Sequence, residues 1–205
     1  WGDVTPALDG NLLNENETYI CNDKTTFIED CKSIKPNAVF LVPKILELVK
    51  NKVEFLDKPY IRLILPYVLK NIFGNNLDLI FMGGAKLDSN VKEFYKENNI
   101  LICEGYGCTE TSPIISVNHH IEPRNEDSVG KILENVDVNI INNEICVSGK
   151  SVMEGYWNDD LKTNEKIFTD INSKKWYKTG DSGYIKDEFL YYNGSKQILD
   201  AHGLL

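Results

Sequence analysis

The chain has 205 residues, of which 42% are hydrophobic and 26% charged, and its formal net charge is −9. This composition is that of a globular protein with a hydrophobic core, long enough for one large domain or two small ones. The negative charge argues against nucleic acid or an anionic membrane surface as the main partner, because phosphates would be repelled. A nucleotide is not excluded, since a divalent cation can bridge phosphates and carboxylates.

The cysteines and histidines predict neither a disulfide framework nor a zinc site. The five cysteines are odd in number and form no C-x-x-C pair, which indicates reduced thiols in a cytoplasmic protein. His119, His120 and His202 lack metal-ligand spacing, so we interpret them as exposed loop residues. The most apolar segment, 61–73, is too short to span a membrane and carries two basic side chains. We expect an amphipathic core helix there and no transmembrane segment.

Along the chain, helix and strand patterns begin to alternate after an irregular polar segment at 1–18. Residues 29–32 are expected to close a helix, and 37–42 (NAVFLV) to form a buried strand. Pro43 suits the first turn of the next helix, because the N–H that proline lacks would have no partner there. The apolar residues that follow Pro43 keep a helical spacing.

Two further apolar runs of strand length follow, at 77–82 (LDLIFM) and 100–103 (ILIC). A helix is expected between them, with an N-cap oxygen supplied from residues 88–90. Strand–helix–strand alternation implies a parallel sheet with right-handed crossovers. The sequence therefore predicts a partial parallel α/β subdomain at 19–115.

The pattern changes to short strands at 116–205. Segments 136–141 (VDVNII) and 144–149 (EICVSG) flank Asn142 and Asn143, which suit a two-residue hairpin turn because asparagine tolerates a positive φ. Further short strands are expected at 176–178, 183–186 and 189–192. This part of the chain is therefore predicted to be a small antiparallel, barrel-like β subdomain.

Two glycine-rich turns follow expected parallel strands, FMGGAKLD at 81–88 and EGYGCTETSP at 104–113. Open α/β sheets bind their ligands at such turns, outside the carboxyl ends of the strands. In the first turn, Gly83, Gly84 and Ala85 present almost no side chain, which lets a planar group approach the backbone.

The second turn looks like neither helix nor strand, and it offers an aromatic ring and oxygen ligands. Gly105 and Gly107 bracket Tyr106, whose ring suits stacking on a base. Thr109 supplies a hydroxyl, and Glu110 is the hard oxygen ligand that Mg²⁺ prefers. Neither a Walker P-loop nor a dinucleotide-binding fingerprint is present. Taken alone, the stretch could equally be an ordinary polar turn.

Five segments, in order, resemble those of the adenylate-forming superfamily, which comprises acyl-CoA synthetases, luciferases and peptide-synthetase adenylation domains. They are KPNAVFLVPKILELV at 35–49, GGAKL at 83–87, EGYGCTETSP at 104–113, SVGKILENVDVNIINNEICVSGKSVMEGYWND at 128–159 and WYKTGDSGYI at 176–185. GGAKL is similar to the family's G-G-A-P-L, with Lys86 in place of proline. EGYGCTETSP is similar to G-Y-G-x-T-E, and WYKTGDSGYI to W-x-x-T-G-D-x-G. The resemblance implies a nucleotide-binding α/β subdomain at 19–115, followed by the family's β-rich subdomain.

The resemblance also implies roles for single residues. The candidate nucleotide-binding residues are Gly83, Gly84, Ala85, Glu104, Gly105, Tyr106, Gly107, Thr109 and Asp181, the first three and Tyr106 lying at adenine. Thr109 would contact the α-phosphate and the substrate carboxylate, and Asp181 would accept hydrogen bonds from the ribose hydroxyls. Glu110 would hold Mg²⁺, so that Thr109 and Glu110 are the candidate catalytic residues. The alternative for Asp181 is a turn-stabilising role.

Three features of the family pattern do not occur in these 205 residues. The phosphate loop T-S-G-T-T-G-x-P-K is absent, and G-R-x-K-D appears only as Gly194-Ser195-Lys196-Gln197, without its arginine. No segment matches the small C-terminal domain with the adenylation lysine, and Lys196 cannot take that role. We therefore interpret the chain as the central part of a longer protein, and we expect its β-rich subdomain to end near the hinge to the next domain. We expect residues 1–205 alone to be inactive.

The resemblance implies a ligase that uses ATP and Mg²⁺ to activate a carboxylic acid as an acyl-adenylate and then forms a thioester with coenzyme A. An acyl-carrier protein is the alternative acceptor. EGYGCTETSP most resembles long-chain fatty-acid ligases, which act in lipid metabolism, whereas amino-acid adenylation domains usually have proline where Cys108 stands. An amino-acid adenylation domain, and a truncated chain that binds nucleotide or a partner without turnover, are the alternatives. We expect a cytoplasmic location, with peripheral membrane association as the alternative.

Overall fold

The structure is a computed structural model that describes residues 17–21, 23, 25–59, 61–84 and 87–201. The predictions made for Ala85, Lys86, His202 and residues 1–16 lie outside the described residues. The chain divides into two compact units, unit 1 at 1–103 and unit 2 at 104–205. The division falls inside a strand, whereas the sequence predicts a boundary between residues 115 and 116, which stays a prediction.

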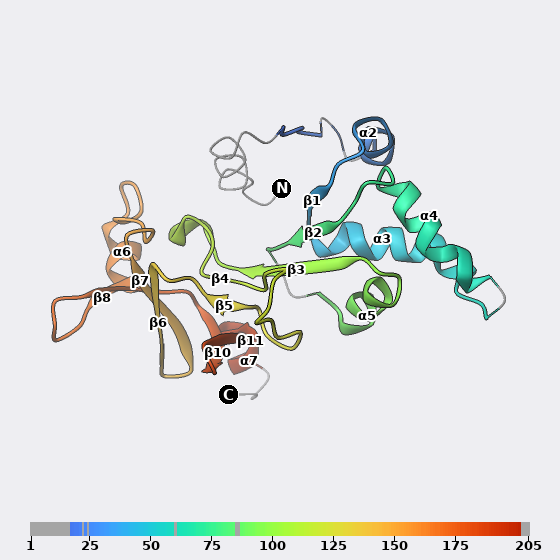
Figure 1. Ribbon diagram of the computed structural model, residues 1–205. Helices are drawn as coiled ribbons and strands as arrows, with labels where there is room; N and C mark the ends of the chain where they lie inside the picture. The colour runs from blue at the N-terminus through green and yellow to red at the C-terminus, as the bar shows by residue number, and fades with distance from the viewer. Residues whose placement is uncertain (1–16, 22, 24, 60, 85–86, 202–205) are drawn as a thin grey trace. The chain divides into compact units, whose positions relative to one another are not determined.

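Unit 1 contains the predicted alternation of helices and parallel strands, drawn in blue to green in Figure 1. Its elements are α2 (Phe27–Ile34), β1 (Ala38–Leu41), α3 (Pro43–Val53), η1 (Glu54–Leu56), η2 (Arg62–Ile64), α4 (Leu65–Ile72), β2 (Leu79–Met82), α5 (Ser89–Glu97) and the first part of β3 (Leu101–Tyr106). β1 and β2 pair in parallel, from Ala38 opposite Leu79 to Leu41 opposite Met82. The predicted parallel sheet with helical crossovers is therefore confirmed.

Local sequence signals set the helix ends of unit 1. Pro43 occupies the first turn of α3, as predicted. The carboxylate of Asp88 accepts a hydrogen bond from the Asn90 backbone N–H at 2.8 Å, so the predicted N-cap of α5 is confirmed. α2 ends at Ile34, where the next residue, Lys35, adopts a left-handed φ of 55°.

The core of unit 1 is formed by the apolar faces of these helices and the strands between them. The segment predicted to be an amphipathic core helix, 61–73, contains η2 and α4 and fully buries Leu65, Leu69 and Phe73. The same cluster includes Leu46 of α3 and Ile80 of β2. Among the described residues, no helix combines the length and the apolar composition needed to cross a membrane.

Unit 2 is built mainly from antiparallel strands. Its elements are η3 (Thr109–Thr111), β4 (Ser116–Val117), β5 (Lys131–Ile132), β6 (Val136–Ile141), β7 (Glu144–Gly149), α6 (Asp160–Lys166), β8 (Ile167–Thr169), β9 (Lys175–Lys178), β10 (Asp181–Lys186), β11 (Phe189–Ser195) and α7 (Lys196–Ala201). From the end of β3 the strand order is β3-β4-β5-β11-β10, and a separate sheet has the order β6-β7-β9-β8. The pairs within both sets are antiparallel, which confirms the predicted β subdomain.

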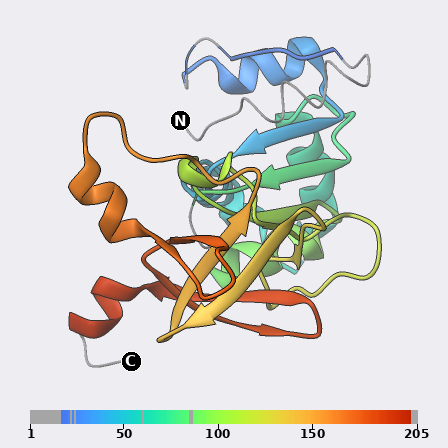
Figure 2. The same cartoon turned by 90° about the vertical axis from the view of Figure 1, so that its left-hand side faces the viewer.

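The β6–β7 hairpin forms as the sequence predicts. Ile141 lies opposite Glu144, and the two turn residues Asn142 and Asn143 have φ of 49° and 59°. In Figure 2 the two strands lie side by side as long arrows in yellow and orange. The hairpin contributes buried residues to the core of unit 2, whose members are Ile115, Val136, Ile145, Val147 and Leu190.

Six of the described elements of unit 2 were not predicted from the sequence: η3, β4, β5, α6, β8 and α7. α6 buries no residue, so it carries no periodic apolar signal. Its start is fixed instead by a cap, in which the carboxylate of Asp159 accepts from the Lys162 N–H at 2.9 Å. β8 is three residues long and pairs only with β9, so its sequence pattern is equally brief.

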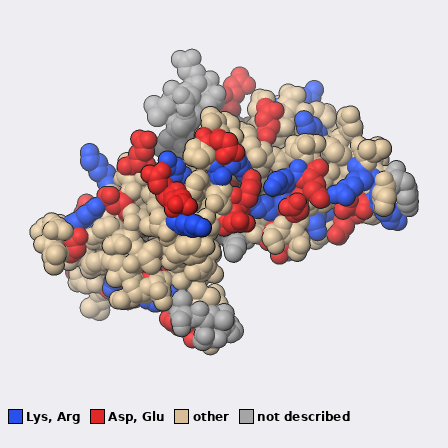
Figure 3. Space-filling model, turned by 60° about the horizontal axis from the view of Figure 1, so that its bottom comes forward, with Lys and Arg blue, Asp and Glu red and all other residues tan. Residues whose placement is uncertain are grey.

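Charged side chains of both signs are mixed on the face shown in Figure 3. On the face shown in Figure 3, Lys and Arg side chains alternate with Asp and Glu side chains, without a continuous basic area among the described residues. Binding of nucleic acid depends on clustered basic side chains that contact phosphates. This face therefore shows no cluster of basic side chains of the kind that nucleic-acid binding uses.

Candidate functional site

The stretch EGYGCTETSP differs from its predicted irregular form at two places. Its first three residues continue β3, and residues 109–111 form the 3₁₀ turn η3. The strand is longer than predicted because Gly105 and Tyr106 pair with Val117 and Ser116 of β4. β4 has only two residues, which is too short for a sequence pattern to reveal.

The turn between β3 and η3 is closed by its own side chains and backbone. Thr111 Oγ1 donates to the Cys108 carbonyl at 2.9 Å and accepts from the Cys108 N–H at 3.3 Å. A Cβ atom on Gly107 would lie 1.7 Å from the carbonyl oxygen of Pro113, so only glycine fits there. Gly107 therefore shapes the turn, and the Thr111 hydroxyl is used inside it.

We expect the substitution Gly107→Ala to lower the free energy of unfolding by about 3 kcal/mol, the upper end of the usual cost of overpacking. The clashing atoms belong to backbone, which cannot move aside without opening the turn. Gly180→Ala is the control, because its Cβ would meet only the Lys166 amino group at 3.5 Å and its φ of 82° costs about 1–2 kcal/mol. Chemical denaturation measures both variants, and equal losses would contradict the packing argument.

Two predicted nucleotide-binding residues, Tyr106 and Asp181, are brought together although they are 75 positions apart. The Tyr106 hydroxyl donates to Asp181 Oδ2 at 2.8 Å. The Tyr106 ring lies 5.5 Å from that of Tyr192, at an angle of 34° between the ring planes. Tyr106 is at the end of β3 and Asp181 at the start of β10, so strand ends from two parts of unit 2 meet here.

The turn before Asp181 is held by other residues. Thr179 Oγ1 accepts from the Asp181 N–H at 3.1 Å and donates to the Ile145 carbonyl at 2.9 Å. Gly180 N–H donates to Glu144 Oε1 at 2.9 Å. The Asp181 carboxylate reaches across to Tyr106, whereas the turn-stabilising alternative would direct it back to its own turn.

The surroundings of Asp181 disfavour its charge. Burial raises the pKa of Asp181, the hydrogen bond from Tyr106 lowers it, Glu144 raises it and Lys166 lowers it, and the net shift is upward. Burial also raises the pKa of Tyr106, and the neighbouring Asp181 raises it further. Tyr106 is therefore a neutral hydrogen-bond donor. The ionised form of Asp181 is less favourable in the folded chain than in the unfolded chain.

We expect Asp181→Asn to raise the free energy of unfolding at pH 7 by about 0.5–2 kcal/mol, the usual range for stabilising substitutions. A carboxyl whose pKa is raised on folding binds its proton more tightly in the folded state. Its unfavourable effect is absent below the ordinary pKa of 3.8 and grows as the pH rises through the raised value. The advantage of the amide should therefore vanish at low pH. Denaturation curves from pH 3 to 8 measure it, with the exposed Asp187→Asn as the charge-matched control.

The predicted metal ligand Glu110 lies in η3 and is held by the segment that precedes α6. Tyr156 OH donates to Glu110 Oε1 at 2.8 Å, and the Met153 N–H donates to the Glu110 carbonyl at 2.9 Å. Burial raises the pKa of Glu110, but hydrogen bonds, first among them that from Tyr156, lower it overall. Glu110 is therefore an ionised carboxylate whose direction is fixed on one side.

Glu110 fits a magnesium ion that takes most of its ligands from elsewhere. Among the described residues, no group of three or more His, Cys, Asp or Glu side chains is placed to hold a metal. Mg²⁺ commonly keeps several waters and binds through one or two carboxylates together with the phosphates of a substrate. One ionised carboxylate beside an exposed threonine, Thr109, matches that pattern.

The remaining predicted residues lie in both units. Glu104 is 5% exposed in β3, and its carbonyl accepts from the Asn118 N–H at 2.7 Å. Gly83 and Gly84 follow β2 in unit 1, and a Cβ on Gly84 would meet no atom within 4 Å. This open space agrees with the close approach predicted for the first glycine turn. That the two glycine turns share one cleft stays a prediction.

Two residues that support the site were not singled out as functional by the sequence. Tyr156 holds Glu110, and its only sequence signal is its place in the M-x-G-Y part of segment 128–159. Glu144 holds the turn before Asp181 and also pairs with Lys196 at 3.4 Å. Lys196 is thus engaged in an ion pair beside this turn.

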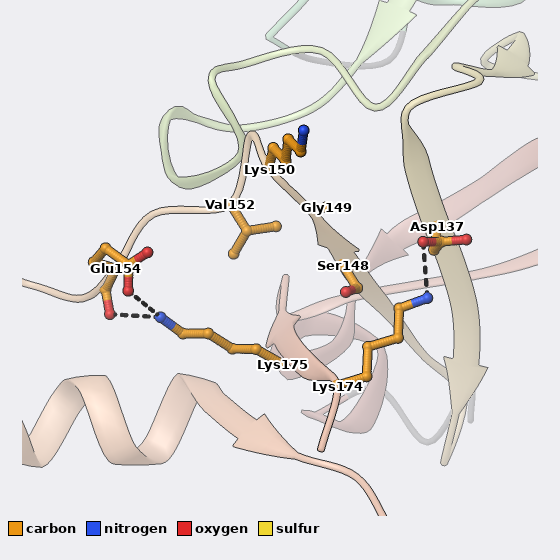
Figure 4. A pocket seen from close by; sticks show the side chains of 8 residues that line it. All are labelled: Asp137, Ser148, Gly149, Lys150, Val152, Glu154, Lys174 and Lys175. Atoms are coloured by element: carbon orange, nitrogen blue, oxygen red, sulfur yellow. Dashed lines mark hydrogen bonds and ion pairs between the residues drawn. The ribbon is translucent and has the colours of Figure 1, made fainter. Parts of the chain in front are cut away.

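A hollow in unit 2, of about 310 Å³, contains none of the predicted site residues. It is lined by Asp137, Ser148, Gly149, Lys150, Val152, Glu154, Lys174 and Lys175. Figure 4 shows two ion pairs across it, Lys174 with Asp137 at 2.8 Å and Lys175 with Glu154 at 2.9 Å. Because these pairs neutralise most of its charge, the hollow has little attraction for a charged ligand.

Comparisons with known proteins agree with this arrangement. A protein-family model described as "AMP-binding enzyme" matches residues 14–157. The chain is 29% identical over 194 residues to "Probable 4-coumarate--CoA ligase 3" of Dictyostelium discoideum, covering 86% of this chain and 32% of that protein. It is 34% identical over 139 residues to "Long-chain-fatty-acid--CoA ligase FadD15" of Mycobacterium bovis, covering 66% of this chain and 22% of that protein.

A solved structure shows the same fold. O-succinylbenzoate coenzyme A synthetase from Bacillus subtilis, in complex with AMP, superimposes with a TM-score of 0.69 and 20% identity, covering 94% of this chain and 38% of that one. The chain thus spans about a third or less of the length of the curated relatives described above. The family match extends over more than half of the chain and includes both glycine turns, Glu110 and Tyr156. The chain belongs to the AMP-binding enzyme family, which confirms its resemblance to the adenylate-forming enzymes.

Proposed function

We propose that the chain is the central part of an ATP- and Mg²⁺-dependent ligase that activates a long-chain fatty acid as its acyl-adenylate and then forms the coenzyme A thioester. The observation that carries the proposal is the hydrogen bond between Tyr106 and Asp181. It joins, in space, the two residues expected at the adenine and at the ribose, in a chain of the AMP-binding enzyme family. We propose a cytoplasmic location, because the five cysteines are free thiols.

In this proposal each predicted residue binds one part of the nucleotide. Tyr106 binds adenine, a role that the resemblance to the adenylate-forming enzymes also implies for Gly83, Gly84 and Ala85. Asp181 has about four lone-pair positions, so accepting from Tyr106 leaves room for both ribose hydroxyls. Thr179 and Glu144 hold the turn before Asp181, which supports an orientation of the Asp181 carboxylate that is set before the nucleotide binds.

At the phosphate end, Thr109 contacts the α-phosphate and the substrate carboxylate, and Glu110 holds Mg²⁺. The cation supplies neutralisation of the phosphate charge. The contribution of the chain is orientation: η3 presents both side chains from one turn, and Tyr156 fixes the direction of Glu110.

The proposed acid is supported by one relative and by one residue of the second glycine turn. A fatty acid is supported by the relative named a long-chain-fatty-acid CoA ligase and by Cys108, which stands where amino-acid adenylation domains usually have proline. The relative named a 4-coumarate CoA ligase covers 86% of the chain, which supports an aromatic acid as the second candidate. Coenzyme A is the proposed acceptor because both relatives are named CoA ligases, with an acyl-carrier protein as the alternative.

Acid-dependent release of pyrophosphate by the natural full-length protein tests the proposal. The panel contains a long-chain fatty acid, 4-coumarate and a mixture of amino acids, each with ATP and Mg²⁺. We expect release with the fatty acid and formation of its thioester when coenzyme A is added. Release with 4-coumarate alone would favour the aromatic acid. Nucleotide binding without release from any acid would support the alternative of a binding protein without turnover.

A further inference from the structure

The side chain of Glu110 is directed by a residue 46 positions later in the chain. Tyr156 OH donates to one carboxylate oxygen, Oε1, at 2.8 Å. The backbone of Glu110 is tied to the same segment, because its carbonyl accepts from the Met153 N–H at 2.9 Å. Side chain and backbone of Glu110 are therefore both attached to residues 153–156.

Tyr156 is itself held firmly on several sides. Its backbone N–H donates to Thr163 Oγ1 at 2.9 Å, and Thr163 Oγ1 donates to the Asp159 carbonyl at 2.8 Å. The amino group of Lys162 lies 4.2 Å from the centre of the Tyr156 ring. Burial and a hydrogen bond with Tyr156 raise the pKa of Tyr177. The backbone and the ring of Tyr156 are thus held by α6.

A carboxylate fixed in this way differs from one that turns freely. Because the Tyr156 hydroxyl engages Oε1, the carboxylate keeps a fixed direction, and its remaining lone-pair positions can serve a cation from that direction. Hydrogen-bond partners behind a metal ligand commonly govern affinity, and their loss typically costs about 10- to 100-fold in metal affinity or activity.

We propose that Tyr156 is a positioning residue that orients Glu110 as the magnesium ligand of the nucleotide site. This inference rests on the proposed function, because it assumes that Glu110 meets a nucleotide-bound cation. Tyr156 acts through Glu110 and makes no contact with the nucleotide. A merely structural Tyr156 would instead affect nucleotide binding equally with and without the cation.

The test is the metal dependence of nucleotide binding by the natural full-length protein. Calorimetry gives the Kd of a non-hydrolysable ATP analogue in Mg²⁺ and in EDTA. The Kd in EDTA divided by the Kd in Mg²⁺ measures how much the cation strengthens binding. For Tyr156→Phe we expect that ratio to fall about 10-fold, with the Kd in EDTA unchanged. Tyr191→Phe is the matched control, since it also loses one hydroxyl hydrogen bond, at 2.8 Å from Asn125, and should leave both values as they are.

Two further variants separate this inference from the proposed function. Glu110→Ala should lower the ratio at least as much as Tyr156→Phe, and the double variant should equal Glu110→Ala, because Tyr156 acts only through that carboxylate. If Glu110→Ala lowers the ratio and Tyr156→Phe leaves it unchanged, the positioning role of Tyr156 is wrong. The proposed function then still stands. An unchanged ratio for Glu110→Ala, or no nucleotide binding by the natural protein, overturns both.

Discussion

Residues 1–205 on their own are expected to form no detectable acyl-adenylate from ATP, Mg²⁺ and a fatty acid. In the adenylate-forming enzymes that the chain resembles, a T-S-G-T-T-G-x-P-K loop serves the phosphates, an arginine near the hinge contacts the ribose, and a lysine serves adenylation. None of these three occurs in the printed sequence at a matching place. Loss of one well-placed stabilising donor typically costs about 10²–10³-fold in rate, so the loss of all three should bring turnover below detection.

The measurement is acid-dependent pyrophosphate release by the purified 205-residue chain, with the natural full-length protein as the positive control. Weak adenine-nucleotide binding by the isolated chain is compatible with this expectation, because Tyr106 and Asp181 both lie within unit 2. Detectable release that requires the acid would show that the residues present suffice for adenylation. The roles assigned to the phosphate loop, the arginine and the lysine would then be wrong.

In the natural full-length protein, Asp181→Ala is expected to lower kcat/KM for ATP by roughly 10- to 150-fold. Hydrogen bonds to a charged group contribute about 1.5–3 kcal/mol, and the substitution removes the acceptor of both ribose hydroxyls. The structure adds a second consequence, since the Tyr106 hydroxyl loses the partner that it has at 2.8 Å.

Tyr106→Phe separates these two effects. It keeps the ring that would lie along adenine and removes only the hydroxyl, so its kcat/KM should fall much less than that of Asp181→Ala. The exposed Asp187→Ala on the β10–β11 turn controls for the loss of one negative charge. If Tyr106→Phe reproduces the full loss, the carboxylate acts by supporting Tyr106, and a ribose contact is not needed to explain it. An unchanged kcat/KM in Asp181→Ala would reduce that residue to a structural role.

The elements that the sequence predicts correctly are those with signals inside one short window. The hairpin turn at Asn142 and Asn143, the proline at the start of α3 and the cap at Asp88 each depend on the conformational preference of one or two residues. α6 escapes prediction for the opposite reason, because a helix that buries no residue has no apolar period to read.

The candidate site is only partly readable for a related reason. The motifs identify Tyr106, Glu110 and Asp181 one at a time, and the family match supports those motifs. No motif states that Tyr106 donates to Asp181 or that Tyr156 donates to Glu110, because each pair joins segments that are distant in sequence. The first contact joins the ends of β3 and β10, and the second joins η3 to the segment before α6. The β4 strand beside them has only two residues and is too short to predict.

The ion pair of Glu144 with Lys196 has a mechanical consequence for the turn before Asp181. Glu144 accepts from the Gly180 N–H at 2.9 Å and holds the Lys196 amino group at 3.4 Å, while the Lys196 N–H donates to the Gly180 carbonyl at 2.8 Å. The tip of one hairpin, one turn and the first residue of α7 therefore form a closed linkage of three members. A force that pulls on the chain beyond Lys196 would therefore be transmitted through these contacts to Gly180 and would shift the Asp181 carboxylate next to it.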